Sequence, residues 1–405
     1  MTIAWEVRAL GDICEIARGG SPRPIQEFIT NDPNGVSWIK ISDATASGKY
    51  IYSTKEKITQ AGVQRSRMVN EGDFILSNSM SFGRPYIMKT SGCIHDGWLV
   101  LSDKKHVFDQ DYLYYFLGSD IAYRQFDSLA AGSTVRNLNI ESAKKVKVPL
   151  PPIAEQKRIA AILDEAFAGI AAATANAEKN LANARELFTS SLNSTFRNIP
   201  VGWTTTTLGE VCDFQGGSQP PKSVFMKVSK DDSVRLIQIR DYKSDNHIVY
   251  IPKGMARRFC NASDVMIGRY GPPLFQILRG IEGAYNVALM KAVPNTKHIT
   301  KDFLYYFLKN GDILKYIIDA SSRAAGQIGL NKETLEPYPI SFPSIEAQGH
   351  LVSKLISLES DTRSLVIIYE QKLQRLAELK QAILQQAFSG ELAALPDAEM
   401  QEEAA

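Results

Sequence analysis

The sequence is poor in the residues that bind metals and form disulfides. It has four cysteines and five histidines in 405 residues, and neither type recurs at the spacing of a metal site. The cysteines, Cys14, Cys93, Cys212 and Cys260, show no close pairing, so we expect buried, reduced thiols in a cytoplasmic protein. This composition argues against a disulfide scaffold and against a metal-dependent activity.

Signatures of catalysis are also missing. No G-x-x-x-x-G-K-[ST] phosphate loop occurs, because Gly48-Lys49 lacks both the upstream glycine and the following Ser or Thr. Gly271-Pro272-Pro273-Leu274 lacks the amide and the aromatic ring of the adenine methyltransferase motif. Glu155-Gln156-Lys157 matches the end of a nuclease motif, but Glu and Lys are common on helix surfaces and chance explains the match better. We therefore expect a non-catalytic chain that binds no cofactor itself.

Long hydrophobic runs and a strong charge of one sign are absent as well. The start has neither the basic nor the apolar region of a signal peptide, and no apolar run approaches the ~20 residues that cross a bilayer, so we expect no membrane partner. The net charge is +2, with 18 Lys and Arg against 13 Asp and Glu in residues 200–344. A mildly basic domain permits nucleic-acid binding, although a strongly basic one would be a stronger indication.

What the sequence does contain is a second copy of itself. The recurring segments are Trp5 with Trp203, Leu10–Cys14 with Leu208–Cys212, Gly19–Ser21 with Gly216–Ser218, Asp111–Leu117 with Asp302–Leu308, Ala130–Gly132 with Ala324–Gly326, and Leu150–Gln156 with Phe342–Gln348. Their order is kept, and the period is far too long for a solenoid. The repeat indicates two like domains, each followed by a like connector.

The connectors predict two long helices. Between Pro152 and Pro200 there is no proline, and apolar or small residues recur mostly three and four apart, as in a coiled-coil seam. The second connector has the same spacing. We expect helices over residues 153–199 and 345–392 that pack antiparallel on each other, with an oligomerisation stalk as the alternative. Gly349 lies near the start of the second helix and predicts a later or frayed start.

The remaining segments predict an α+β protein. Residues 1–152 and 200–344 form two similar mixed α/β domains, which the antiparallel helices relate by a pseudo-two-fold axis. The predicted strands include Val36–Ile41, Phe74–Ser77, Leu99–Leu101, Val234–Ile239 and Val265–Gly268. One amphipathic helix is expected in each domain, over Asp111–Phe126 and Asp302–Ile318, with aromatic residues in the core rather than stacked on bases. Residues 393–405 are expected to be an acidic, disordered tail.

These segments carry a resemblance to a known family. The openings Trp-x4-Leu-Gly-Asp/Glu, the run Pro151–Ile159 and the ending Ala387–Leu392 resemble the specificity subunit of Type I restriction–modification enzymes. The resemblance covers essentially the whole chain. The second copy departs from the pattern, because Gln348-Gly349-His350 stands where Gln156-Lys157-Arg158 stands in the first.

The resemblance implies a division of labour between subunits. Each domain is a target recognition domain that reads one half of a bipartite site in double-stranded DNA, and the two helices fix the spacing. Two modification (methyltransferase) subunits, which carry S-adenosylmethionine, dock on the helices, and restriction subunits join the larger complex. Catalysis then resides in the partners. The alternative is a coiled-coil interaction scaffold with two adaptor domains that binds proteins and no DNA.

The candidate DNA-binding groups lie in polar, glycine-rich loops, where backbone N–H groups approach phosphates and Arg, Lys, Asn, Gln or Ser reach base edges. In the first domain they are Gly20, Ser21, Arg23, Asn78, Ser79, Ser81, Arg84, Ser133, Thr134 and Arg136. In the second domain they are Gly217, Ser218, Gln219, Lys222, Arg240, Tyr242, Lys243, Arg269, Tyr270, Arg323 and Gln327.

Overall fold

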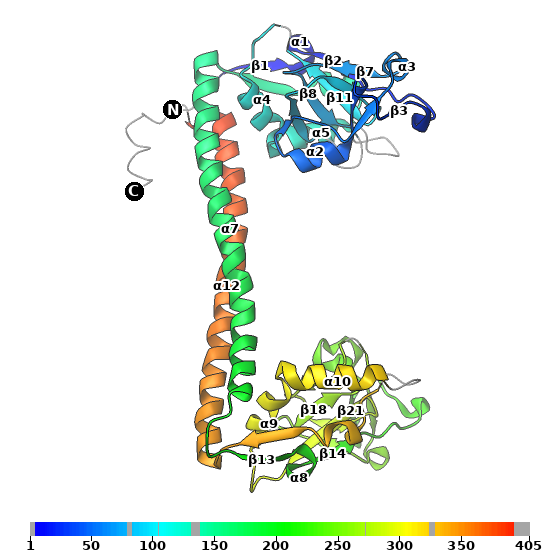
Figure 1. Cartoon of the computed structure of the whole chain (residues 1–405), viewed down its shortest axis with the longest axis vertical. Coiled ribbons are helices and arrows are strands. Elements are labelled where there is room, and N and C mark those ends of the chain that lie inside the picture. Colours follow the sequence, from blue (N-terminus) through cyan, green and yellow to red (C-terminus); the bar gives the residue numbers. More distant parts are fainter. Residues whose placement is uncertain are drawn as a thin grey trace. The chain divides into compact units, whose positions relative to one another are not determined.

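The chain folds into two compact units that share its two long helices. The computed structural model describes residues 5–78, 83–103, 105–130, 138–271, 273–323 and 329–392. Unit 1 comprises Met1–Ala177 with Gln371–Ala405, and unit 2 comprises Glu178–Glu370. Each unit contains one mixed α/β domain and one half of each long helix, α7 (Ile153–Arg197) and α12 (Ile345–Ser389) (Figure 1). The α+β class and the two like domains are therefore confirmed.

The domain of unit 1 contains two five-stranded sheets and a two-stranded ribbon. The first sheet has the order β2-β11-β8-β9-β5 and the second β3-β6-β4-β10-β7, and β1 pairs with β12. The strands are β1 (Glu6–Ala9), β2 (Glu15–Arg18), β3 (Ile29–Thr30), β4 (Val36–Ile39), β5 (Tyr50–Ile51), β6 (Glu56–Ile58), β7 (Arg67–Val69), β8 (Phe74–Ser77), β9 (Pro85–Met88), β10 (Gly92–Ile94), β11 (Trp98–Ser102) and β12 (Lys147–Leu150). Strands β8 and β9 are buried at every position, so both faces of the first sheet are covered.

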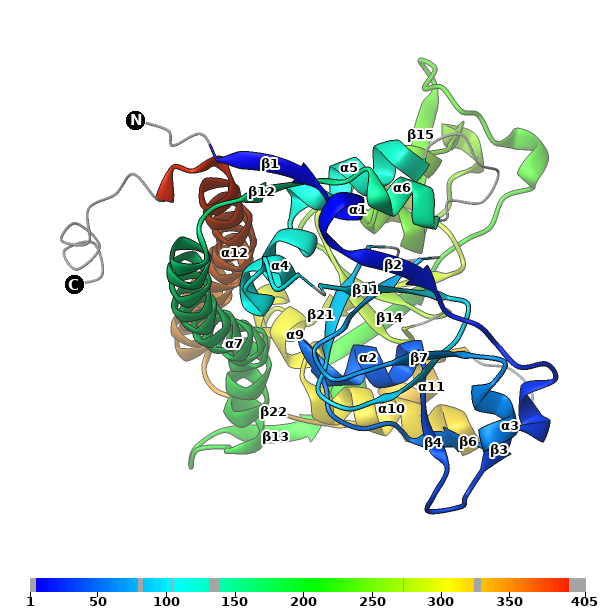
Figure 2. The same cartoon turned by 90° about the horizontal axis from the view of Figure 1, so that it is seen from above.

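The domain of unit 2 repeats this plan with fewer strands. Its sheets have the orders β14-β21-β18-β19 and β16-β15-β20-β17, and β13 pairs with β22. The strands are β13 (Thr204–Thr207), β14 (Cys212–Gly216), β15 (Ser233–Ile237), β16 (Tyr250–Pro252), β17 (Phe259–Cys260), β18 (Val265–Gly268), β19 (Gln276–Leu278), β20 (Gly283–Tyr285), β21 (Leu289–Pro294) and β22 (Pro339–Phe342). Strands β14, β21 and β18 thus correspond to β2, β11 and β8 (labelled in Figures 1 and 2).

Short helices connect the strands in both units. In unit 1 they are α1 (Leu10–Ile13), η1 (Ile25–Glu27), α2 (Ile41–Ser47), α3 (Gln60–Val63), α4 (Gln110–Leu117), α5 (Asp120–Ala130) and α6 (Ile140–Lys144). In unit 2 they are α8 (Leu208–Val211), η2 (Lys222–Val224), η3 (Ile239–Tyr242), η4 (Asp245–His247), η5 (Lys253–Met255), α9 (Lys301–Leu308), α10 (Gly311–Arg323) and α11 (Lys332–Leu335).

The prediction of one amphipathic helix per domain is wrong, because each segment is broken into two helices. In unit 2 the side chain of Asn310 accepts from the N–H groups of Asp312 (2.9 Å) and Ile313 (3.2 Å) and so caps the start of α10. In unit 1 Ser119 accepts from the N–H of Ala122 (3.3 Å) at the start of α5. The predicted burial of the aromatic residues in the first of these helices is confirmed.

The long helices run antiparallel within each unit. In unit 1 the guanidinium of Arg158 donates to the carbonyl of Leu392 (3.1 Å), and in unit 2 Arg185 donates to Glu370 (2.8 Å). The first contact joins the start of α7 to the residues just after α12, and the second joins the later part of α7 to the middle of α12. Helix α12 begins at Ile345 and includes Gly349, so the expected late start is wrong.

The composition of helix α7 bears on the expectation of no membrane partner. Its length and composition suffice to cross a membrane. Alanines together with Ile159, Ile162, Leu163, Phe167 and Ile170 make its first half apolar, although Asp164 and Glu165 interrupt the run. Length and composition alone do not assign a membrane helix, because Ile159 and Leu163 of α7 are fully buried in the core of unit 1.

Each domain core is completed by a phenylalanine from the last turns of a long helix. In unit 1 the Phe388 ring of α12 packs edge-on against Tyr112 (5.4 Å between centroids) and Phe116 (5.3 Å). In unit 2 the Phe196 ring of α7 packs in the same way against Phe303 (5.5 Å) and Phe307 (5.3 Å). The C-terminal turns of each helix therefore belong to the hydrophobic core.

A buried glutamine fastens the first turn of each long helix. The side chain of Gln156 is fully buried; it accepts from Asp109 N–H (2.8 Å) and donates to the carbonyls of Val107 (3.0 Å) and Pro151 (2.9 Å). Its repeat equivalent makes the corresponding three bonds in unit 2, from Thr300 N–H (2.9 Å) and to the carbonyls of His298 (2.7 Å) and Pro343 (3.0 Å). The repeated Glu/Ala-Gln motif is thus a structural anchor.

Tyrosine–carboxylate contacts add a second attachment between domain and helix. In unit 1 the Tyr115 hydroxyl donates to Asp164 of α7, and Lys49 lies 3.5 Å from the same carboxylate. In unit 2 Tyr306 donates to Glu359 of α12 (2.8 Å), which also pairs with Lys309 (2.9 Å). Each helix is therefore held at the same aromatic helix of its domain.

Candidate nucleic-acid interface

In unit 1 several loops meet at one end of the first sheet. The N–H of Gly19, which follows β2, donates to the carbonyl of Trp98 at the start of β11 (2.9 Å). Asn78, which follows β8, donates its N–H to Gly97 (3.0 Å) and accepts from the N–H of Leu138 (2.9 Å). The three glycine-rich loops predicted to bind DNA in the first domain therefore begin or end at one edge of the first sheet.

Unit 2 reproduces this junction. The N–H of Gly217, after β14, donates to Leu289 at the start of β21 (3.0 Å). Arg269, after β18, donates its N–H to Ala288 (2.9 Å) and accepts from the N–H of Leu330 (3.0 Å). The same backbone pattern joins the corresponding loops, so the two domains present equivalent edges.

The hydrogen bonds correct the alignment of the glycine-rich loops by one residue. Gly19 is equivalent to Gly217 and not to Gly216. A Cβ on Gly19 would lie 2.0 Å from the carbonyl oxygen of His95, and one on Gly217 would lie 1.9 Å from that of Asn286. The backbone of each loop thus crosses a strand-connecting turn at a distance that only glycine allows.

The next residues, Gly20 and Ser218, are equivalent too. Their N–H groups donate to the carbonyls of Ile94 and Tyr285, each at 3.1 Å. Both N–H groups are therefore used within the fold and are not free for phosphate. The prediction of phosphate contact at these two backbone positions is accordingly replaced by a structural role.

Asp96, which was not among the predicted residues, binds several groups at the loop edge of unit 1. Asp96 accepts from the hydroxyl of Ser21 (2.6 Å) and from the guanidinium of Arg23 (3.2 Å). The hydrogen bond from Ser21, more than the nearby Arg23 charge, holds the pKa of Asp96 below its ordinary value. The Arg23 side chain is 81% exposed and keeps most of its donors free. The dipeptide Asp96-Gly97 is a turn signature that could have identified this position.

Asn78 does not have the exposed side chain that was expected. It is 1% exposed, and its Nδ2 donates to the carbonyl of Asp96 (2.9 Å). The side chain therefore ties the end of β8 to the turn before β11. The prediction that Asn78 lies in a solvent-facing loop is wrong, because its backbone and side chain both close the sheet edge.

Arg269, its equivalent in unit 2, is likewise engaged inside the domain. Its guanidinium donates through Nε to Leu330 O (2.8 Å), through Nη2 to Asn331 Oδ1 (3.0 Å) and through Nη1 to Val287 O (3.3 Å). The last bond corresponds to that from Asn78 to Asp96. The expectation that Arg269 is a free loop arginine is therefore wrong, because its donors hold the segment at Leu330 and Asn331.

In unit 2 several other candidates surround one pocket. It has a volume of 740 Å³ and is lined by Gln219, Pro220, Pro221, Lys222, Phe225, Gln238 and Arg240. The side chains of Gln219, Lys222 and Arg240 are exposed. These residues come from the loop after β14 and from η3, so segments some 20 residues apart in sequence converge there. Gln238 was not among the predicted residues.

The remaining candidates have different environments. Arg84 is exposed, with its guanidinium 5.5 Å from the ring centre of Tyr86, and Lys243 is also exposed. Tyr270 is 41% exposed. Tyr242 packs against the second core of its domain, and burial raises the pKa of its hydroxyl, so its predicted place on a loop surface is wrong.

Some predicted residues are not characterised by the structure. Ser79, Ser81, Ser133, Thr134, Arg136 and Gln327 lie outside the described residues. Arg323 ends helix α10.

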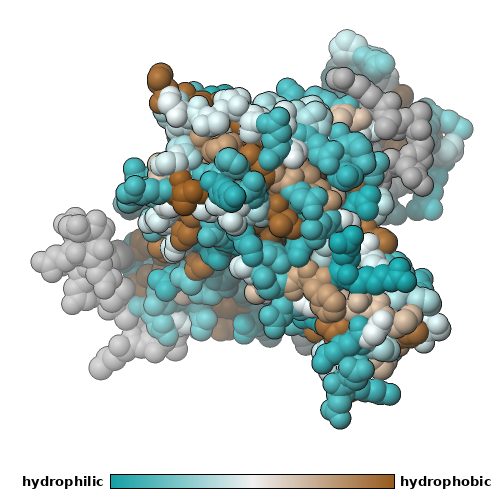
Figure 3. Space-filling view, turned by 90° about the horizontal axis from the view of Figure 1, so that it is seen from below, coloured by the Kyte–Doolittle hydropathy of each residue, from teal (hydrophilic) through white to brown (hydrophobic). Residues whose placement is uncertain are grey.

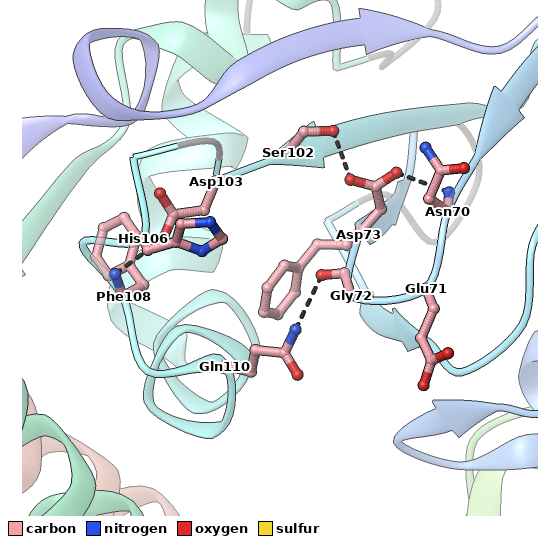
Figure 4. Close-up of a pocket in the computed structure, with 10 residues that line it drawn as sticks. Asn70, Glu71, Gly72, Asp73, Ser102, Asp103, His106, Phe108 and Gln110 are labelled. Atoms are coloured by element: carbon pink, nitrogen blue, oxygen red, sulfur yellow. Dashed lines mark hydrogen bonds between the residues drawn. The ribbon is translucent and has the colours of Figure 1, made fainter.

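The opposite end of the first sheet holds an acidic pocket of 490 Å³ (Figure 4). Asp73 accepts from the hydroxyl of Ser102 (2.6 Å), and Asp103 accepts from the N–H of Phe108 (2.9 Å). Glu71 also lines the pocket. Its carboxylates repel phosphates, which leaves the Gly19 edge as the candidate interface of unit 1.

The described residues offer little that metal binding or cysteine chemistry requires. They contain no group of three His, Cys, Asp or Glu side chains that could hold a metal ion. All four cysteines are free and buried, as expected, and burial raises the pKa of Cys260 to about 11. On the face drawn in Figure 3, hydrophobic side chains are interspersed with hydrophilic ones.

Comparison with known families identifies this architecture. The family described as the Type I restriction modification DNA specificity domain matches residues 3–181 and again residues 200–375. The chain belongs to this family. The two matches coincide with the two copies of the repeat, so each unit carries one specificity domain, as the resemblance implied.

Individual relatives support the assignment over the full length. The chain is 22% identical over 417 residues to the Type I restriction enzyme MjaVIII specificity subunit of Methanocaldococcus jannaschii, covering 96% of this chain and 93% of that protein. It is 23% identical over 329 residues to the EcoKI specificity subunit of Escherichia coli, covering 73% and 68%.

Solved structures show the same fold. One, from work on complex assembly and conformational transition of the Type I restriction–modification system, has a TM-score of 0.74 at 20% identity and covers 95% of this chain and 97% of that chain. The HsdS subunit of Thermoanaerobacter tengcongensis has a TM-score of 0.65 at 20% identity, covering 96% and 97%.

Proposed function

We propose that this specificity-family chain recognises a bipartite double-stranded DNA site, with one domain reading each half. The observation that carries the proposal is the equivalent loop edge in the two domains, built by the same backbone bonds around Gly19 and Gly217. Two similar domains whose loop side chains differ suit an asymmetric site with two different halves. Arg23, Arg84, Lys222, Arg240 and Lys243 are exposed cations among the candidate residues.

The proposal assigns catalysis to other subunits. Two modification subunits that carry S-adenosylmethionine dock on α7 and α12, restriction subunits join the larger complex, and the long helices set the distance between the half-sites. We expect this chain itself to bind no cofactor and to act in the cytoplasm. The runner-up, a scaffold that binds only proteins, leaves the exposed cations at the loop edges without a role.

Exchange of one domain tests the proposal. Replacing residues 1–150 with the equivalent domain of a relative of different specificity should change one half of the methylated motif and leave the other half intact. Methylation sequencing of cells that express the exchanged chain with the modification subunits reports both halves at once. The reciprocal exchange of residues 200–344 is the control and should change only the other half. Simultaneous change of both halves in either exchange contradicts the two-reader proposal.

Two arginines distinguish DNA contact from structural support. Arg84→Ala should weaken DNA binding without lowering thermal stability, because the side chain is exposed. Arg269→Ala should destabilise unit 2 by about 1–3 kcal/mol, because three acceptors lose their donor. Thermal unfolding and DNA binding at several salt concentrations separate the two effects. An Arg84→Ala chain that binds DNA as tightly as the parent would remove Arg84 from the interface.

A further inference from the structure

Unsatisfied polar atoms concentrate at the start of η3 in unit 2. Among the described residues, four buried side-chain atoms without a hydrogen-bond partner lie within eight residues of the sequence, namely Arg235 Nε, Gln238 Nε2, Asp241 Oδ1 and the Tyr242 hydroxyl. Buried polar atoms in folded proteins are nearly always paired, so such a concentration calls for an explanation. A ligand group that enters next to this segment is one, because Gln238 also lines the pocket beside it.

The pocket in front of this segment is rich in hydrogen-bond donors. Lys222 and Arg240 are exposed at its wall, and neither has an ion pair with a carboxylate in the part of the chain that the structure describes. No Asp or Glu lines the pocket. The ring of half-buried Phe225 forms an apolar part of the wall. The pocket therefore suits a planar group that carries hydrogen-bond acceptors.

The balance of donors and acceptors selects among the base pairs. Guanine presents two acceptors, N7 and O6, in the major groove, whereas adenine presents one acceptor and one donor. Arg240 and Lys222 have donors only, whereas Gln219 and Gln238 can also accept. The guanidinium of Arg240 presents two donors side by side and so matches an edge with two acceptors.

The corresponding place in unit 1 has a different character. Lys40 and Gln238 occupy equivalent positions, since each donates its N–H to the aspartate three residues later, at 3.0 Å and 3.1 Å. The ammonium of Lys40 is neutralised by Glu56, and Ser42 stands where unit 2 has Arg240. The donor pocket is therefore a property of the second domain and not of the shared fold.

We infer that this pocket reads a guanine in the half-site of the second domain, with Arg240 donating to N7 and O6 and Lys222 to an adjacent phosphate. The inference rests on the proposed function and adds which residue specifies which base. It makes Arg240 a specificity-determining residue, while Gln238 lies on the pocket wall beside it.

The test uses the full chain expressed with its modification subunits in cells that lack this methylation. Exchange of residues 200–344 identifies the half-site that the second domain reads. Methylation sequencing of the parent should show a G·C pair among the specified positions of that half-site. Arg240→Ala should lower the preference for that pair by about 10-fold to 100-fold, and the other half should stay unchanged. Arg240→Gln should shift the preference at the same position toward adenine, because glutamine pairs with the N6/N7 edge.

Lys297→Ala is the matched control, because Lys297 is an exposed cation beyond the end of β21 that does not line the pocket. Its motif should equal that of the parent. An unchanged motif with Arg240→Ala, or a uniform loss of affinity for all sequences, overturns the guanine assignment while the two-reader function stands. A second half-site without any G·C pair also overturns it. If the parent complex shows no sequence-specific methylation at all, it is the proposed function that fails.

Discussion

Replacing Gln156 with leucine is expected to destabilise unit 1 by about 3–6 kcal/mol, a large part of the stability of a typical domain. The side chain is fully buried and makes three hydrogen bonds, to Asp109 N–H and to the carbonyls of Val107 and Pro151. Leucine has a similar volume but leaves all three backbone groups without this partner. Denaturant unfolding of the purified chain measures the loss.

Two further variants define the cause. Gln156→Glu keeps an acceptor for Asp109 but removes both donors, and should be at least as damaging because it also buries a carboxylate. Gln374→Leu is the control on a long helix, since Gln374 is exposed and bonds only Glu378, and it should change stability by less than about 0.5 kcal/mol. Equal effects of Gln156→Leu and Gln374→Leu would show that the anchor contributes nothing.

Gly217→Ala is expected to have the second large effect, on both folding and DNA recognition by the second domain. The new methyl group would lie 1.9 Å from the carbonyl oxygen of Asn286, far inside the contact distance. The loop must therefore move away from the turn before β21, and with it Gln219 and Lys222 in the proposed guanine pocket. We expect a loss of about 2–4 kcal/mol in unfolding free energy and loss of methylation at the target.

The neighbouring glycine provides the control. At Gly216 the nearest atom to an added Cβ is Arg269 Nη1 at 3.9 Å, an ordinary contact, so Gly216→Ala should fold and methylate normally. Gly19→Ala in the first domain should behave like Gly217→Ala, because its Cβ would lie 2.0 Å from His95 O. Gly217→Ala with unchanged unfolding and an unchanged motif would contradict the equivalence of the two edges.

The sequence predicted the architecture because its strongest signals are long. A repeat in fixed order and two proline-free helices leave few alternatives for the domain plan. The boundaries of the shorter helices were predicted wrongly. Ser119 and Asn310 are N-cap residues, and recognising them would have divided each predicted amphipathic segment into two helices. The anchoring role of Gln156 was invisible, because burial of a polar helix residue depends on what the rest of the chain packs around it.

The sequence predicted which loops lie together more accurately than it predicted which of their side chains are exposed. The glycine-rich loops do meet at one edge in each domain. Asn78 and Arg269 were assigned to DNA on residue type alone, but carbonyls from neighbouring turns take up their donors. Gln238 was missed because its significance lies in an unpaired buried atom, which has no signature in sequence.

The division of α7 and α12 between the units has a consequence for biogenesis. Unit 2 is one uninterrupted stretch, Glu178–Glu370, whereas unit 1 needs residues from both ends of the chain. On the ribosome, most residues of unit 1 emerge first, yet Leu384 and Phe388 of its core are translated only after the whole of unit 2. The core of unit 1 therefore stays incomplete until α12 has been translated, by which time all residues of unit 2 are present. The order in which the two units complete their folds is thus the reverse of the order in which they begin to be synthesised.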